Sequence, residues 1–390
     1  MASKAATGSG RAVTRERLFG WIDGALLTLI LGSLGVVAVA GLIQVRYGSY
    51  DMTFAQAWNA VFNPKVLFSW QAWDAFLFGG ELPEEIGVKS RIVWTIRLPR
   101  VLVAVLVGMN LAISGAIFQA VTRNELASPF ILGVSSGAGL TILVTLVFLG
   151  GMSITIPIVG IVLGLQSLLP VLAAVGGIVA FLIVYVIAWK NGTSPVRLVL
   201  AGVIVGTVFQ SLETAMFVFA DSIAVVQSAI AWTTGSLTGT DWEQVRIALP
   251  WSILAVGLAL VSSRQLNVLL LGESTAKSLG MNVERVRFAL SGVAVLAAAA
   301  SISVAGIVGF VGLIVPHMVR NVVGSDYRKL IIGCLFAGPA LMVAADVGAR
   351  LGLQFLFGSS GQLPVGIVTG LVGGPYFLYL MRKQEQMGEI

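Results

Sequence analysis

The sequence predicts an all-α membrane protein with ten transmembrane helices, and three observations lead to this class. Of the 390 residues, 57% are hydrophobic and only 11% are charged, whereas a water-soluble domain carries about 25% charged residues. The apolar residues form long runs bounded by charges, prolines or polar clusters. A spanning helix needs about 20 such residues, so the length holds eight to eleven spans and leaves no room for a large soluble domain.

Ten apolar runs are predicted as helices of a single transmembrane domain over residues 20–381. They lie near residues 20–44, 98–120, 130–150, 166–189, 196–220, 246–264, 286–305, 307–323, 328–351 and 363–381. Gly306 and Gly309 divide the stretch 286–323, which is longer than one tilted helix needs. The stretch 152–165 is short and broken by glycine and proline, so we expect it to extend its two neighbouring helices.

The distribution of lysine and arginine predicts the orientation of these helices. One side of the ten-helix arrangement carries 16 basic residues, including those of the tails 1–19 and 382–390, and the other side carries 8. The richer side is expected in the cytoplasm, together with both termini. The basic residues stand singly between apolar runs, as charges that set topology do, so nucleic-acid binding is not expected.

The first apolar run has an alternative interpretation as a signal peptide. Arg11, Arg15 and Arg17 precede it, and residues 38–40 read Ala-Val-Ala, as at a cleavage site. Residues 24–43 exceed a typical signal-peptide core and are long enough to span, so we favour a retained helix. Cleavage would leave nine spans with the same orientation.

The longest polar segment, residues 46–97, falls on the outer side. It contains four tryptophans, Trp58, Trp70, Trp73 and Trp94. Tryptophans among charges are typical of the membrane–water boundary, so we expect helical turns lying on the outer surface. The segment ends in Arg97-Leu-Pro-Arg100. These arginines are either an interfacial pair before a helix that the proline begins, or an anchor for carboxylates of an outer partner.

Small residues are dense in the second and third predicted helices. Gly108, Ser114 and Gly115 lead to Gln119, and the third helix opens with small residues over 132–139. Such residues allow helices to pack backbone to backbone, or leave room for a passage.

The cytoplasmic segment 264–287 predicts a helical knob. Ser274 is expected to cap a short helix that Gly280 ends, and Asn282 to cap the next helix. A capped knob suits docking into the groove of a partner, and the alternative is an ordinary interfacial loop. The stretch is not a phosphate-binding loop, because Ala276 occupies the position of the required second glycine.

Few residues offer chemistry within the spans. The single Cys334 and the single His317 cannot assemble a Cys/His metal site, so any metal is expected to arrive already chelated. Intramembrane charges are functional candidates by default. Glu213, Asp346 and His317 could carry protons, while Asp346 and Arg350 at i, i+4 could instead form a structural pair, which we favour.

Read together, the motifs of this chain resemble those of the FecCD family of permeases from ABC importers for iron-siderophores, haem and cobalamin. The similar segments lie at 97–100, 114–119, 124–129, 132–138, 200–203, 235–237, 272–280, 309–317, 345–350 and 363–366. They follow the family order from about residue 90 to 380. One departure is Glu125, which stands where the family usually has proline, so the rigidity of that turn is open.

The resemblance implies a type II ABC importer permease that is not itself an enzyme and binds no cofactor. Two permease subunits, identical or homologous, would frame one pathway in the bacterial cytoplasmic membrane. Two ATPase subunits would bind ATP and Mg²⁺ on the inner face, and an extracytoplasmic binding protein would deliver the metal chelate. Siderophores are the family's commonest cargo, and haem and cobalamin stay open.

The resemblance also implies roles for particular residues. Arg97, Arg100 and Arg350 would receive acidic residues of the binding protein. Coupling to the ATPase would fall to Gly272, Glu273, Ser274, Ala276, Leu279 and Gly280. The gate or pathway would contain Gln119, Asn124, Glu125, Leu126, Thr193 and Ser194. A proton-coupled secondary transporter and a sensory or scaffold membrane protein are the competing classes.

Overall fold

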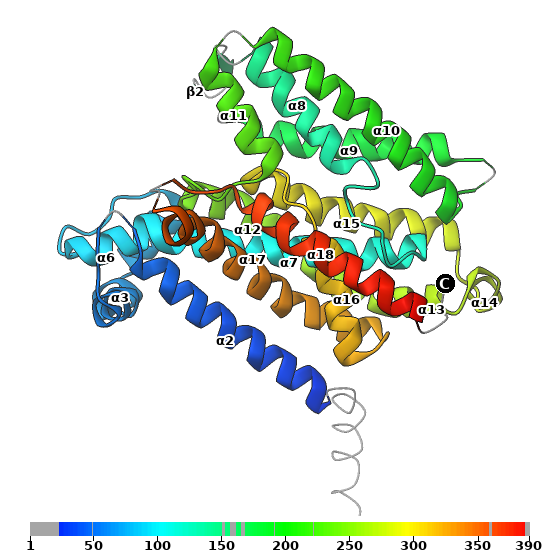
Figure 1. Cartoon of the computed structure of the whole chain (residues 1–390), viewed down its shortest axis with the longest axis horizontal. Coiled ribbons are helices and arrows are strands. Elements are labelled where there is room, and N and C mark those ends of the chain that lie inside the picture. The colour runs from blue at the N-terminus through cyan, green and yellow to red at the C-terminus, as the bar shows by residue number, and fades with distance from the viewer. Residues whose placement is uncertain are drawn as a thin grey trace, which may run out of the picture.

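Helices form nearly all of the described structure (Figure 1). This computed structural model describes residues 23–386 except positions 49, 150–152, 157–160, 165–167, 191, 221 and 359–360. The predicted tail 1–19 and residues 387–390 therefore lie outside the described residues.

Every predicted apolar run coincides with a helix. These helices are α2 Gly24–Arg46, α7 Leu98–Thr122, α8 Val134–Phe148, α9 Leu169–Ala188, α10 Pro195–Met216, α12 Trp242–Val261, α15 Val283–Ala305, α16 Val311–Val323, α17 Tyr327–Phe357 and α18 Val365–Gln386. Seven helical segments of the described chain are long and apolar enough to cross a membrane, and α8, α16 and α18 are shorter apolar helices. The all-helical membrane class is confirmed, while the number of ten crossings stays a prediction.

Two elements differ from the sequence-based expectation. The stretch 152–165 does not extend its neighbouring helices, but contains the antiparallel strands β1 Ser153–Ile156 and β2 Ile161–Gly164. Isoleucine, valine and threonine dominate these strands, and their stiff branched side chains favour extended backbone. A helix that was not predicted, α11 Ile223–Thr234, follows the 3₁₀ turn η3 Phe217–Phe219.

The helix that contains Pro99 begins earlier than predicted. Helical backbone runs from α6 Val88–Ile92 through the π-helical turn η1 Val93–Arg97 directly into α7. A proline within a helix lacks an N–H group and its ring clashes with the carbonyl four residues earlier. The wider π turn immediately before Pro99 relieves this conflict, so the proline does not start the helix.

Helix α7 lies at the centre of the bundle and packs against α15, α16 and α17 (Figure 1). Gly108 meets Gly338 of α17 and Gly115 meets Gly312 of α16 so closely that a Cβ atom on either α7 glycine would overlap the facing carbonyl. The Ser114 hydroxyl donates to the carbonyl of Ala294 on α15 at 2.7 Å. These small residues thus serve backbone-to-backbone packing, the first of the two interpretations.

The segment before α7 consists of short helices, as predicted: α3 Phe54–Val61, α4 Pro64–Leu67 and α5 Trp70–Phe78. Its tryptophans divide into two groups. Trp58 and Trp70 are exposed, whereas Trp94 is buried, stacks on Phe76 and accepts at its carbonyl from the Trp242 indole at 2.6 Å. The expectation of four interfacial tryptophans was wrong for Trp94, because the short helices fold back onto α12 and enclose it.

The break at Gly306 is confirmed. Helix α15 ends at Ala305, and α16 begins at Val311. The break is closed by backbone hydrogen bonds from Ser236 N–H to the Ala305 carbonyl at 2.8 Å and from Ile307 N–H to the Trp232 carbonyl at 2.9 Å. The end of α11 is thereby attached to the end of α15.

Candidate functional site

The predicted knob is present as α13 Ser263–Leu270 and α14 Glu273–Ser278, followed directly by α15. Gly280 ends α14 with φ +82°, its N–H donates to the Lys277 carbonyl, and the next N–H donates to the Ala276 carbonyl. This pair of bonds is the Schellman motif of a glycine-ended helix. Asn282 caps α15 by accepting from the Arg285 N–H at 3.1 Å, as predicted.

Ser274 does not have the predicted capping role. Helix α14 begins at Glu273, so Gly272 takes the cap position, with φ +108° and no side-chain hydrogen bond. The reason is geometric, since glycine alone accepts this backbone conformation without strain. Ser274 lies inside the helix, where its carbonyl accepts from the Ser278 hydroxyl at 3.0 Å.

The knob presents apolar side chains to its surroundings. Ala276 is fully buried and holds α14 to the bundle, while Leu271 and Leu279 are 61% and 65% exposed. Helix α14 stands at one end of the molecule, beside α13 and away from α3 and α6 (Figure 1). A short rigid helix with exposed leucines suits insertion into the groove of a partner.

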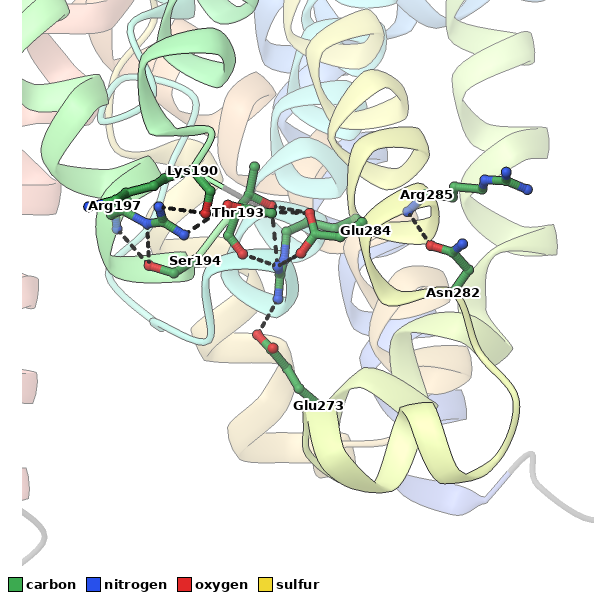
Figure 2. Close-up of polar contacts among 10 residues, drawn as sticks. Lys190, Thr193, Ser194, Arg197, Glu273, Asn282, Glu284 and Arg285 are labelled. Atoms are coloured by element: carbon green, nitrogen blue, oxygen red, sulfur yellow. Dashed lines mark hydrogen bonds and ion pairs between the residues drawn. The ribbon is translucent and has the colours of Figure 1, made fainter.

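A buried arginine, Arg287, connects this knob to the body of the protein. Its side chain is 1% exposed and forms ion pairs with Glu273 of α14 and with Glu284 of its own helix. It also donates to the backbone carbonyl of Thr193 at 2.7 Å. Figure 2 shows Glu273, Glu284 and Thr193 converging from three separate segments. The guanidinium plane suits such a junction because it offers five N–H donors in a fixed arrangement.

Thr193 and Ser194 belong to this junction. The Thr193 N–H and hydroxyl both donate to Glu284 Oε2, at 3.0 and 2.7 Å. Ser194 caps α10 by accepting from the Arg197 N–H at 3.2 Å, and Arg197 donates to the Gly192 carbonyl at 2.8 Å (Figure 2). Thr193 is buried, and its hydrogen bonds fix the α9–α10 turn to α15. Its place at the gate stays a prediction.

A second polar cluster lies where α7 ends. The Glu125 carboxylate is 3.0 Å from Arg320 and 3.4 Å from His317, both on α16. Arg320 also donates to Gln119 Oε1 at 3.0 Å. The hydrogen bond from His317 and the charge of Arg320 hold the pKa of Glu125 below its ordinary value. The turn that lacks the usual proline is thus tied to α16 by charge.

The remaining predicted gate residues take local roles in the same turn. Asn124 accepts from the Leu126 N–H at 2.9 Å, which is an Asx turn. Leu126 is exposed beside it. Gln119 is buried between α7 and α16, because its amide also donates to the Leu313 carbonyl at 3.4 Å. Gln119 therefore contacts α16 in this structure, and its role in the gate or pathway stays a prediction.

The arginines predicted to dock a binding protein lie together at the opposite end of the bundle, but two of them are buried. Arg100 forms a two-pronged ion pair with Asp346, at 2.7 and 2.8 Å, and donates to Gln362 at 2.8 Å. Arg97 donates to the backbone carbonyls of Val45, Arg46 and Tyr50. Each of these two guanidinium groups binds groups of its own chain in this structure, and their role in docking a binding protein stays a prediction.

Arg350 is half-buried and donates to the Gln44 carbonyl at 3.0 Å. The predicted i, i+4 pair of Asp346 with Arg350 was wrong, since both oxygens of Asp346 accept from Arg100 and one also accepts from the Gln44 amide. A two-pronged guanidinium–carboxylate pair satisfies more of the carboxylate than a single contact along one helix.

The three groups considered as proton carriers do not form a chain. Asp346 is paired with Arg100 at one end, His317 contacts Glu125 near the other, and Glu213 lies on α10 beside Gly139 of α8. Each group thus belongs to a separate part of the described structure, and a proton relay needs neighbouring members.

Sequence reasoning missed the central role of Arg287 and its partner Glu284. Their i, i+3 spacing at the start of α15 could have indicated a pair. Nothing in the sequence indicates that Arg287 is buried or that Glu273 and Thr193 reach it, because these contacts join segments that are remote along the chain.

Comparison with known proteins agrees with this architecture. The profile of the FecCD transport family matches residues 36–383. The cobalamin import system permease protein BtuC of Halobacterium salinarum is 41% identical over 80% of this chain and 80% of its own length. The Fe(3+)-citrate import system permease protein YfmD of Bacillus subtilis is 41% identical over 76% of this chain and 83% of its own.

Two further comparisons extend over nearly the whole chain. The hemin transport system permease protein HmuU of Yersinia pestis is 32% identical over 92% of this chain and 96% of its own. A solved structure, described as an inward-facing conformation of a proposed metal-chelate type ABC transporter, superposes with a TM-score of 0.72 at 25% identity. It covers 91% of this chain and 99% of that chain.

Proposed function

Because the chain belongs to the FecCD transport family, we propose that it is the permease of an ATP-driven importer that moves a ferric siderophore into the cytoplasm. The chain is a membrane-embedded transport subunit and not an enzyme, since its relatives are permease subunits and the ATPase is a separate subunit. The direction of transport, the cargo and the orientation in a bacterial cytoplasmic membrane are our proposals.

The observation that carries this proposal is the rigid knob at α14. It combines a Schellman end at Gly280, a buried anchor at Ala276 and exposed leucines at 271 and 279. Such a knob can transmit a displacement only if a partner binds it. Two ATPase subunits that bind ATP and Mg²⁺ would be that partner. No ATP site is proposed on this chain.

A row of exposed polar side chains on α10 supports a second permease subunit and a polar pathway. Thr207, Gln210, Ser211 and Thr214 follow the i, i+3, i+4, i+7 pattern of one helix face and are exposed. Polar side chains on a spanning helix are rarely directed at lipid. We therefore place a second copy or a homologous permease opposite α10, with the solute pathway between the two subunits.

The chemistry of this row favours a chelate that carries hydrogen-bond donors. The Thr207, Ser211 and Thr214 hydroxyls donate to carbonyls four residues earlier, so their oxygens keep free acceptor capacity. Uncharged acceptors suit a solute that brings amide or hydroxyl donors, as siderophores do. Relatives named for hemin and cobalamin import make these chelates the alternatives.

Transport would proceed by alternating access. ATP binding draws the motor subunits together, α14 moves with them, and the helices around the pathway tilt from one opening to the other. The solute moves inward because the binding protein and the two permease conformations hold it with different affinities. The energy comes from ATP, so no bond of the solute changes.

Docking of the binding protein is proposed at the end that carries α3 to α6. Arg350 is half-exposed there, while Arg97 and Arg100 serve the fold. Lys65 and Arg91 on the short helices are exposed cations at the same end. Carboxylates of a binding protein would meet these groups, whose mutation would slow docking without unfolding the permease.

The proposal is tested by reconstituting the permease with its ATPase and binding protein in liposomes and comparing cargoes. Uptake of an iron-loaded siderophore that needs ATP inside and binding protein outside is the expected result. If only haem or cobalamin is taken up under the same conditions, that chelate is the cargo and the siderophore assignment is wrong. If none of the three is taken up in an ATP-dependent way, the importer function itself is contradicted.

A further inference from the structure

We propose that Arg287 is the positioning residue through which α14 moves the start of α10, so that the two segments shift as one body during transport. This inference rests on the proposed function and adds a route for the motion inside the chain. The route runs from Glu273 through the Arg287 guanidinium to the α9–α10 turn and Ser194, which caps α10.

The first step is the link from the knob to α15. Glu273 is the first residue of α14, and its carboxylate pairs with Arg287 one turn into α15. Gly280 and its neighbours already join the two helices through the main chain, but a glycine turn can bend. The ion pair between Glu273 and Arg287 is a second connection between α14 and α15. It restricts bending at the Gly280 turn, because it joins the start of α14 to α15.

The second step is the link from α15 to the α9–α10 turn. Arg287 donates to the Thr193 carbonyl, and Glu284 accepts from the Thr193 N–H and hydroxyl. With a further hydrogen bond from Arg287 to the Thr193 hydroxyl oxygen at 3.2 Å, four hydrogen bonds hold this one residue of the turn. Arg197 holds the turn from its other side through the Gly192 and Lys190 carbonyls (Figure 2). A turn fixed in this way cannot move independently of α15.

Burial makes the junction stiff. Arg287 is 1% exposed. A buried guanidinium that loses its partners is left as an unpaired charge out of water, which is strongly unfavourable. Separation of Glu273 or Thr193 from Arg287 is therefore unfavourable, and displacement of α14 carries the turn along. Helix α10 bears the exposed polar row proposed to face the solute, so a motion of its first turn acts on the pathway.

The test compares two substitutions in the complete importer in liposomes. Glu273→Gln removes the charge that reaches Arg287 but leaves Arg287 paired with Glu284, so folding and assembly are retained. Arg285→Gln changes an exposed arginine on the same helix turn and is the matched control. We expect the ATP consumed per solute to rise by about fivefold or more in Glu273→Gln, because α14 then moves without carrying the α9–α10 turn. Arg285→Gln should leave that ratio unchanged.

A distance measurement isolates positioning from general damage. The one native cysteine, Cys334, is fully buried, so spin labels on Lys277→Cys of α14 and Val196→Cys of α10 report only these sites. In the parent protein the separation of the labels should stay constant between nucleotide-free and ATP-bound complexes. In the Glu273→Gln background it should change with ATP.

Three results would overturn the inference while leaving the proposed function standing. The first is an unchanged ATP-to-solute ratio in Glu273→Gln, and the second is a label separation that changes with ATP in the parent protein although uptake is ATP-driven. The third is equal coupling in Arg287→Lys, which keeps the charge but loses the planar guanidinium, and in Arg287→Met. Absence of ATP-driven uptake by the parent complex would instead contradict the proposed function and this inference with it.

Discussion

Buried guanidinium groups organise both polar ends of this bundle. Arg287 joins three segments near α14, and Arg100 joins α7 to α17 through Asp346 at the opposite end. A buried charge is tolerated only with partners, so each arginine fixes the helices that supply its partners. The charges therefore set the relative positions of helices that apolar contacts alone would leave free to slide.

Replacement of Asp346 by asparagine should destabilise the protein strongly. The change leaves the buried Arg100 guanidinium without a counter-charge, which costs about 3–5 kcal/mol in comparable buried pairs. We expect a clearly lower thermal midpoint in detergent, with most of the loss recovered in Arg100→Met combined with Asp346→Leu. Arg91→Met, at an exposed cation of α6, is the control. Equal midpoints of Asp346→Asn and the parent would contradict the structural role.

The Glu125 cluster predicts a pH-dependent contribution to stability. The pKa of Glu125 is lower in the folded protein, first through the His317 hydrogen bond and then through the Arg320 charge. Its stabilisation is therefore complete above the unfolded carboxyl value of about 4.3 and is lost as pH falls through the lower folded value.

Glu125→Gln is the variant that tests this dependence. Because the Glu125 side chain is 46% exposed, we expect a loss below about 1 kcal/mol at neutral pH. Thermal midpoints measured at pH 7 and again at a pH well below the lowered folded pKa of Glu125 should differ between variant and parent only at pH 7. An equal difference at both values would exclude the ion pair as its cause.

At the scale of elements, hydropathy and charge patterns locate helices but not their contacts. Every predicted run contains a helix, because 20 apolar residues have few other states in a membrane protein. The π turn before Pro99 and the paired strands β1 and β2 were not predicted, since local backbone geometry and branched side chains decide them. The partners of Arg100 and Arg287 escaped as well, because they depend on tertiary packing.

The end of α14 is the element whose geometry is most open to test. Gly280 has φ +82° and donates its N–H to Lys277, and proline can provide neither. Gly280→Pro should uncouple ATP hydrolysis from uptake by at least about tenfold in the complete importer. Gly292→Ala, at an α15 glycine with open space around it, should transport normally. Unchanged coupling in Gly280→Pro would show that the knob is only a connecting loop.

At the scale of the whole molecule, the chain has the features of one subunit of a larger assembly. It has a rigid knob at one end, an exposed polar row on α10 and a cluster of short helices at the other end. Each of these surfaces is left open in the single chain, and α14, α10 and the short helices α3 and α6 lie at different sides of the bundle (Figure 1). A permease subunit that contacts an ATPase on the inner side, a second permease subunit and an outer binding protein would account for all three surfaces together.

The most direct test of the central claim is the energy source for solute uptake. The purified chain should hydrolyse no ATP, and in liposomes it should transport nothing under a proton gradient. Together with its ATPase and binding protein, it should import the chelate only when ATP is present on the α14 side. Uptake by the chain alone, driven by a proton gradient without ATP, would contradict this account.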